Sequence, residues 1–155
     1  MMRGLSGILA GFMFCLISTS AVGADVAPSD VVFKDDIEIV ASLTGGAGDV
    51  AAGRKTFANR KQGNCLACHV NADLNEQSFH GEIGPPLDGV ADRYSEAELR
   101  AIVVNSKIAL NEDTIMPGFY TLNVGVRVAK KFDGKTILSA QQVEDVVAYL
   151  QTLKE

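Results

Sequence analysis

The chain has few of the side chains that hold metal clusters or carry nucleophilic chemistry. Its 155 residues include only two histidines and three cysteines, and no serine–histidine–acid arrangement can be recognised. It also lacks an excess of positive charge, because 19 acidic residues outnumber 14 basic ones. This balance argues against nucleic acid or an anionic membrane as the main partner. No internal repeat or low-complexity segment is present.

A long apolar run occurs only at the N-terminus. One basic residue, Arg3, is followed by a mostly apolar run over residues 5–17 and by small residues before Asp25. This order is typical of a secretory signal peptide, so we expect cleavage after residues 1–24 and export to the periplasm. Two glycines and a run of hydroxyl residues weaken the alternative of an uncleaved membrane anchor. Bulky residues before Cys15 weaken that of a lipid anchor there.

Cleavage at this point would leave about 130 residues, enough for one compact domain but not for two. We expect an extended N-terminal arm over residues 25–48, which ends in a glycine-rich stretch, and a domain over residues 49–155. The mature chain would keep two cysteines, Cys65 and Cys68, and a single methionine, Met116. The functional interpretation therefore depends mainly on these three residues.

The two cysteines belong to the sequence Cys65-Leu66-Ala67-Cys68-His69. The C-x-x-C-H spacing is typical of a c-type haem attachment site. Each thiol can add to one vinyl group of the porphyrin, and the adjacent histidine is then held beneath the iron as its axial ligand. We therefore predict one covalently attached haem c, with His69 as an iron ligand.

Three other interpretations of the cysteines remain open at this point. A zinc site could use both thiols with His69 and His80, although structural zinc sites usually separate their ligand pairs along the chain. A thioredoxin-like dithiol requires a strand–helix–strand unit around it, which the flanking sequence does not show. A plain disulfide would leave the adjacent histidine unexplained.

The second axial position is assigned to Met116. It precedes Pro117, which disfavours helix for the residue before it and predicts a loop methionine that can direct its thioether at a metal. The alternative is that Met116 fills the core, as methionines often do. His80 is the rival ligand, but a position eleven residues after His69 favours a surface or loop histidine.

The loop around Gly84-Pro85-Pro86-Leu87 supplies candidate haem contacts. A metal-bound histidine usually donates its free ring N–H to a carbonyl or carboxylate. We expect the Pro85 carbonyl to accept that hydrogen bond and Leu87 to pack on the porphyrin. The two prolines also stiffen the loop in any interpretation.

Capping patterns predict three helices. Asp49 begins the first, with Val50, Gly53 and Phe57 on one face. Capping boxes at Ser95/Glu98 and Ser139/Gln142 begin the other two, which extend to about residues 105 and 153. Asp133-Gly134 between short alternating runs, 124–128 and 136–138, predicts a small β-hairpin.

Taken in order, these motifs resemble class I cytochromes c. The matching residues are Gly53 and Phe57 in the first helix, Cys65 to His69, Gly84 to Leu87, Met116-Pro117, and Tyr149-Leu150 in the last helix. The resemblance implies an all-α fold with three core helices around one haem, long loops and an N-terminal arm, to which the possible hairpin is added.

Longer strings resemble the SoxX family, the monohaem cytochrome subunits of bacterial thiosulfate oxidation. They are Gly63 to His69, Gly81 to Pro85, Leu87 to Tyr94 and Gln141 to Leu150, preceded by Thr44 to Asp49. The resemblance implies a heterodimer with a larger haem subunit, SoxA. Together these form an L-cysteine S-thiosulfotransferase that oxidatively joins thiosulfate to a cysteine of the carrier SoxYZ.

In that family the sulfur chemistry takes place at the partner's haem, so the resemblance gives this chain no catalytic residue of its own. It implies an electron relay from that haem to a small soluble cytochrome c. Two other functions stay open: a free soluble cytochrome shuttle, and a haem sensor or peroxidase that would require Met116 to detach from the iron.

Overall fold

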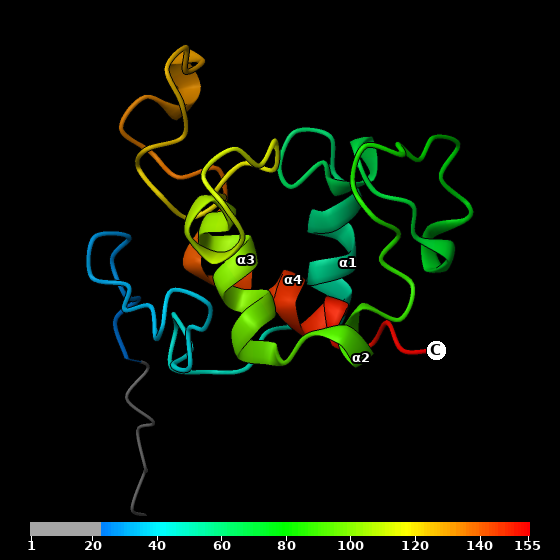
Figure 1. Ribbon diagram of the computed structural model, residues 1–155, viewed down its shortest axis with the longest axis horizontal. Helices are drawn as coiled ribbons and strands as arrows, with labels where there is room; N and C mark the ends of the chain where they lie inside the picture. Colours follow the sequence, from blue (N-terminus) through cyan, green and yellow to red (C-terminus); the bar gives the residue numbers. More distant parts are fainter. Residues whose placement is uncertain (1–22) are drawn as a thin grey trace, which may run out of the picture.

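The computed structural model describes residues 23–155, so all but the last two residues of the expected signal peptide lie outside the description. The described chain forms four α-helices and contains no strand, which confirms the all-α prediction (Figure 1). None of the helices in residues 23–155 has the length and apolar character needed to cross a membrane. The helices are α1 (Val50–Ala58), α2 (Val90–Arg93), α3 (Glu96–Ala109) and α4 (Ala140–Leu150), with 3₁₀ turns at Cys65–Ala67, Ala72–Leu74 and Lys130–Phe132.

The three long helices begin where the sequence places their caps. The Asp49 carboxylate accepts a hydrogen bond from the backbone N–H of Ala52 at 2.7 Å. Both expected capping boxes are formed, at Ser95 for α3 and at Ser139 for α4. Each cap satisfies N–H groups that have no partner within the helix, and is worth about 1 kcal/mol.

Helices α1 and α4 cross in close contact at Gly53. A Cβ atom at this position would lie 1.9 Å from the Asp145 carbonyl oxygen, so only glycine permits the approach. One turn on, the rings of Phe57 and Tyr149 meet edge to face with their centroids 5.5 Å apart. Val50, predicted to lie on the same face as Gly53 and Phe57, is 44% exposed and is not buried with them.

The apolar face predicted for α4 is buried in full. Removal of each such side chain from water stabilises the fold by about 1.5–3 kcal/mol. The residues are Val143, Val146, Val147, Leu150 and, just beyond the helix end, Leu153.

Helix α3 is kinked at Asn105, near its predicted end. This residue has φ −153° and ψ 89°, which interrupts the helical hydrogen-bond ladder. The carbonyl groups of Val103 and Val104 instead accept hydrogen bonds from the backbone N–H groups of Phe119 and Tyr120, both at 3.1 Å. The kink therefore attaches the loop that follows Met116 to α3.

The predicted hairpin over residues 124–138 is wrong. The turn itself exists, since Gly134 has φ +64° and the Lys135 N–H donates to the Phe132 carbonyl at 3.0 Å. No strands flank it, because an isolated two-stranded ribbon with no face to bury is marginal in water. Leu138, the last residue of the second run, donates its N–H to the Phe119 carbonyl at 3.0 Å instead.

The arm, residues 25–48, packs on α3 and α4 without regular secondary structure apart from one bridge between Lys34 and Glu38. A buried ion pair holds it there. The Arg100 guanidinium contacts the Glu144 carboxylate at 2.9 Å and donates to the Ile39 carbonyl at 3.0 Å. Glu144 in turn accepts from the Leu43 N–H at 2.8 Å. Both charged side chains are at most 3% exposed, so the arm completes a polar network inside the protein.

Candidate haem-binding site

A cavity of about 460 Å³ lies among α1, α3, α4 and the loops between them. Its lining is mostly apolar, which suits a large planar group with little hydrogen-bonding capacity. All six residues that the sequence marks as haem contacts line it: Cys65, Cys68, His69, Pro85, Leu87 and Met116.

The cysteine motif enters the cavity through a tight bend after α1. Gly63 packs so closely that a Cβ atom there would lie 2.8 Å from the Thr56 carbonyl oxygen. Asn64 follows in the left-handed conformation, with φ +51°, and the 3₁₀ turn then carries Cys65. Asparagine tolerates this conformation better than most residues. The bend therefore sets the direction in which the cysteine motif leaves α1.

The Cys65 thiol does not have the character of a redox-active thiol. Cys65 and Cys68 are both free, with no disulfide between them. Burial raises the pKa of the Cys65 thiol to about 12, so it stays protonated at neutral pH. A redox or metal-binding cysteine has the opposite character, because the thiolate is the reactive form.

His69 is oriented by the loop that carries Pro85. Its Nδ1 lies 2.8 Å from the Pro85 carbonyl oxygen, so Nδ1 carries the hydrogen and donates. Nε2 is then the nitrogen with a free lone pair for a metal. Gly84 makes the contact possible, because a Cβ atom there would lie 2.3 Å from Cε1 of the ring. The role of His69 as an iron ligand stays a prediction.

The Pro85 loop is held along the cysteine motif by three backbone hydrogen bonds. The N–H groups of Gly81, Gly84 and Leu87 donate to the carbonyls of Leu66, Cys68 and Val70, at 2.7–2.9 Å. The motif and the loop thus form one wall of the cavity, and Leu87 reaches the lining from it.

Met116 lies in the wall formed by the loop after α3. It is partly buried against the core and lines the cavity. Its carbonyl accepts a hydrogen bond from the Ser106 hydroxyl at 2.6 Å. Together with the Phe119 and Tyr120 bonds to the kinked helix, this contact places Met116 and His69 on the same cavity from separate loops. Ligation by Met116 stays a prediction.

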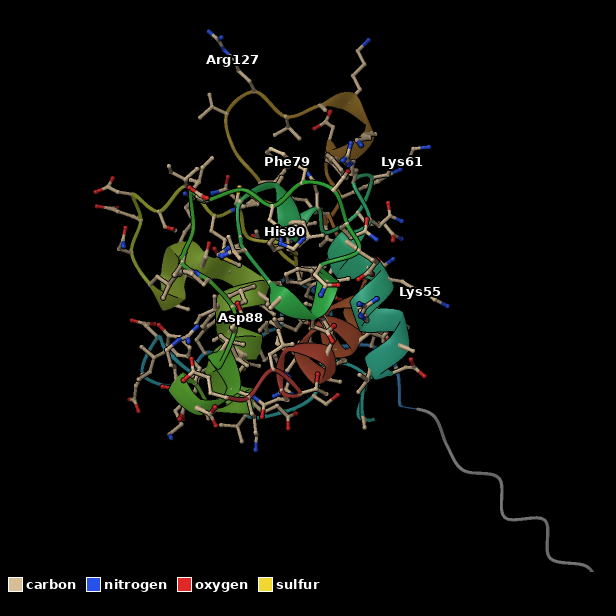
Figure 2. All side chains as sticks on the ribbon, turned by 90° about the vertical axis from the view of Figure 1, so that its right-hand side faces the viewer. Lys55, Lys61, Phe79, His80, Asp88 and Arg127 are labelled. Carbon is tan, nitrogen blue, oxygen red and sulfur yellow. The ribbon has the colours of Figure 1, made fainter. Side chains whose placement is uncertain are left out.

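His80 does not line the cavity; Figure 2 shows it in the loop region between α1 and α2. Both of its ring nitrogens are engaged by backbone: Nδ1 accepts from the Asn71 N–H at 3.3 Å, and Nε2 lies 3.1 Å from the Leu74 carbonyl. Residues 23–155 contain no group of three or more histidine, cysteine or acidic side chains that could hold a metal ion. The described structure thus gives the zinc interpretation no site.

A hydrogen-bond network around the buried Tyr149 and Asn71 side chains was missed by the sequence analysis. The Tyr149 hydroxyl accepts from the Asn71 side chain at 2.9 Å and donates to the Asp73 carboxylate at 2.8 Å. Asp73 also pairs with Arg54 at 2.8 Å, which lowers the pKa of its carboxyl. Burial and the bond to Asp73 raise the pKa of Tyr149. A fully buried asparagine, Asn71, has no signature in a single sequence that could have revealed this network.

The residues present fit a covalently bound haem. An apolar cavity places two thiols, an imidazole with its second nitrogen already hydrogen-bonded, and a thioether on a common lining. The His69 imidazole and the Met116 thioether would be the candidate ligands of the haem iron, and an iron ligated by both would have no position left for a substrate. This donor set suits electron transfer better than bond-making chemistry.

Comparison with known families agrees with this geometry. The cytochrome c family profile matches residues 50–154. The chain is also 45% identical to a chain in the crystal structure of SoxXA from P. pantotrophus, with a TM-score of 0.78. That match covers 85% of this chain and 100% of the other. The chain belongs to the cytochrome c family, and within it to the SoxX type. A search of the curated proteins found no match.

Membership of the cytochrome c family carries two consequences. Cytochromes of this family bind haem c covalently, and the two cysteines that such attachment requires are present at Cys65 and Cys68. The family's role is electron transfer, which agrees with a site whose candidate ligands leave no open position. The similarity extends over the whole of the solved chain, so it includes part of the arm as well as the domain.

Proposed function

We propose that this chain is the electron-relay subunit of a SoxAX-type L-cysteine S-thiosulfotransferase. That complex oxidatively joins thiosulfate to a cysteine of a SoxYZ carrier, and this chain passes the released electrons to a small soluble cytochrome c. The observation that carries the proposal is the 45% identity to a chain of a solved SoxXA complex, over the full length of that chain.

In this proposal Cys65 and Cys68 would hold the haem through thioether links, and His69 and Met116 would be the ligands of its iron. The bound haem supplies one-electron redox chemistry. His69 is kept in one orientation by the 2.8 Å contact between Nδ1 and the Pro85 carbonyl. Met116 is kept beside the cavity by the Ser106 hydroxyl and by the kink in α3.

The surrounding side chains keep water away from these ligands. Phe57, Leu99, Phe119 and Leu150 line the cavity and are almost completely buried. An apolar environment and a thioether ligand both favour the reduced iron, which raises the reduction potential relative to a pair of histidines. Because the ligands are supplied by loops fixed to the helices, little rearrangement is needed between the oxidation states.

The proposed partners can be tested by isolation of the mature protein from the periplasm of its native host. We expect a larger haem protein to copurify with it, and we expect thiosulfate and the carrier to reduce the haem of this chain within the complex. Isolation of a monomer that reacts equally well with several oxidases would favour the free shuttle instead. The same preparation tests export, because N-terminal sequencing should start at Asp25.

A further inference from the structure

Charge is unevenly distributed along this acidic chain. The segment over residues 121–137, here called the basic lobe, carries four basic residues and one acidic one, Asp133. The arm over residues 25–48 has the opposite balance, with five acidic residues and only Lys34. None of the basic residues of the lobe forms an ion pair within the described part of the chain. The four basic residues of the lobe are Arg127, Lys130, Lys131 and Lys135.

The basic lobe extends away from the helices. It rises from the body of the protein beyond α3 in Figure 1, and Figure 2 shows Arg127 at its outer end. All four basic side chains are exposed, and so are two apolar ones: Val126 completely, and Leu122 by 54%. A projecting surface that combines unpaired cations with exposed apolar side chains is typical of an interaction site.

The base of the lobe forms part of the haem-binding cavity. Phe119 and Leu138 flank the lobe, are joined by a backbone hydrogen bond of 3.0 Å, and both line the cavity. Ile115, on the same lining, is 79% exposed. A protein bound to the lobe would therefore lie beside the cavity, where an electron could pass over a short distance.

We propose that the basic lobe is the docking surface for an acidic face on the soluble electron acceptor of this cytochrome. The inference rests on the proposed relay function and adds the place and the charge of the acceptor contact. A redox protein fits better than a nucleic acid or an anionic membrane, because those extended polyanions would also meet the acidic arm. Attraction between a local basic patch and an acidic face of a partner accelerates association although this chain is acidic overall.

Two variants of equal overall charge test the lobe in the purified complex. The first, Arg127→Glu with Lys130→Glu, reverses two charges in the lobe and leaves Lys131 over the Phe132 ring, 4.5 Å from its centroid. The control, Lys55→Glu with Lys154→Glu, reverses two exposed charges elsewhere; Figure 2 shows Lys55 on the side of α1. The acceptor is the small soluble cytochrome c purified from the same periplasm.

The first measurement is the second-order rate constant of electron transfer to this acceptor, followed at increasing salt concentration. We expect the wild-type rate to fall with salt, because screening weakens the attraction. The lobe variant should be about tenfold slower at low salt and lose this dependence, while the control stays within about twofold of the wild type. Equal behaviour of the two variants would overturn the proposal.

The second measurement needs no electron transfer. Carbodiimide coupling joins lysine amines to carboxylates that touch them, and mass spectrometry identifies the joined peptides. We expect links from Lys130, Lys131 or Lys135 to acidic residues of the acceptor. Links that map only outside residues 121–137 would overturn the proposal.

Assembly with the larger haem subunit separates the remaining outcomes. A lobe variant that fails to assemble while the control assembles would place the lobe in the subunit interface, and the proposal would be wrong. A wild-type complex that thiosulfate and the carrier do not reduce would contradict the proposed function alone. The rates and the coupling can still be measured with chemically reduced protein in that case.

Discussion

His69 and Met116 line the same cavity, but the two sides that carry them are held by different means. On the His69 side the side chain itself is restrained, because Nδ1 lies 2.8 Å from the Pro85 carbonyl and Gly84 packs against the ring. On the Met116 side only the backbone is restrained, through the hydrogen bond from the Ser106 hydroxyl to the Met116 carbonyl. The direction of the His69 ring is thus set before a metal binds, whereas the direction of the Met116 thioether depends on packing.

The wider support of the two sides differs in the same way. The His69 side is joined to α4 and α1 by the buried Tyr149 hydroxyl and the Arg54–Asp73 pair. The Met116 side is joined to one helix, at the kink of α3, and otherwise to irregular chain: Leu138 donates to the Phe119 carbonyl, and the Tyr120 hydroxyl donates to the Val26 carbonyl. We therefore expect substitutions on the His69 side to affect folding and haem incorporation, and substitutions on the Met116 side to affect mainly the properties of the iron.

The largest effect should follow from removal of both thiols, which lie on the His69 side. Cys65→Ala with Cys68→Ala should abolish covalent attachment, because no thioether can form. Denaturing electrophoresis followed by a haem stain should show no pigment that migrates with the polypeptide. Pigment retained at the wild-type level would exclude the cysteines as the attachment site.

Met116→Ala should leave the haem attached but lower its reduction potential, because loss of the thioether removes the ligand that favours reduced iron. The variant should also bind carbon monoxide, which the wild type should exclude. Redox titration and difference spectra measure the two effects. An unchanged potential would remove Met116 from the ligand set and break the proposed division between the two sides.

Two glycine substitutions compare the sides directly. Gly84→Ala places a methyl group 2.3 Å from the His69 ring, which the Pro85 contact prevents from moving freely. We expect a loss of about 1–3 kcal/mol in the free energy of unfolding and a lower yield of haem-loaded protein. In Gly118→Ala the added methyl group would lie 2.7 Å from the methyl group of Thr121. The Thr121 side chain is short and can rotate, so the loss in the free energy of unfolding should be smaller. Denaturant titration of both variants measures the two losses in the free energy of unfolding. Equal losses would contradict the expected difference between the two sides.

Tyr149→Phe should lower the free energy of unfolding by about 2 kcal/mol at neutral pH. The substitution removes a hydrogen bond to a charged group and leaves a buried Asn71 donor without a partner. Arg54 and, after it, the Tyr149 hydroxyl lower the pKa of Asp73, so the stability contributed by the Tyr149–Asp73 bond is complete above the unfolded pKa of about 3.9 and is lost as the pH falls through the folded value. The difference between wild type and variant should therefore narrow in acid. Unfolding curves measured from neutral pH into acid check this; a difference independent of pH would contradict it.

The smallest effect is expected for Ser106→Ala. It removes one hydrogen bond to a backbone carbonyl and should cost about 1 kcal/mol. Because this bond restrains the loop and not the thioether, the variant should keep Met116 on the iron but admit carbon monoxide slowly, which the wild type excludes. A variant that excludes carbon monoxide as the wild type does would show that packing alone holds the loop.

The sequence predicted those features that depend on neighbouring residues. Helix caps are local, so Asp49, Ser95 and Ser139 located three helix starts correctly. The hairpin prediction failed although its turn at Gly134 was correct, because strands need a partner or a surface to pack on.

Charged residues on predicted buried faces were an unused signal. Arg100 and Glu144 lie next to the apolar residues Leu99 and Val143 in the sequence, and both are buried in the structure. The two residues are 44 positions apart along the chain, and their pairing completes a network with the backbone of the arm. A charge beside a buried apolar position therefore pointed to a long-range partner that no local pattern could identify.

What the sequence alone determined is the chemistry: two thiols and an imidazole in one short motif, a lone methionine before a proline, and the helices that surround them. These depend on bonding and on contacts within a few residues, which the order of the chain fixes directly. Tertiary structure alone decided the setting of that chemistry. The kink that holds the Met116 loop, the Tyr149 network and the Arg100–Glu144 pair each join segments distant in sequence, and such contacts form only once the core brings those segments together.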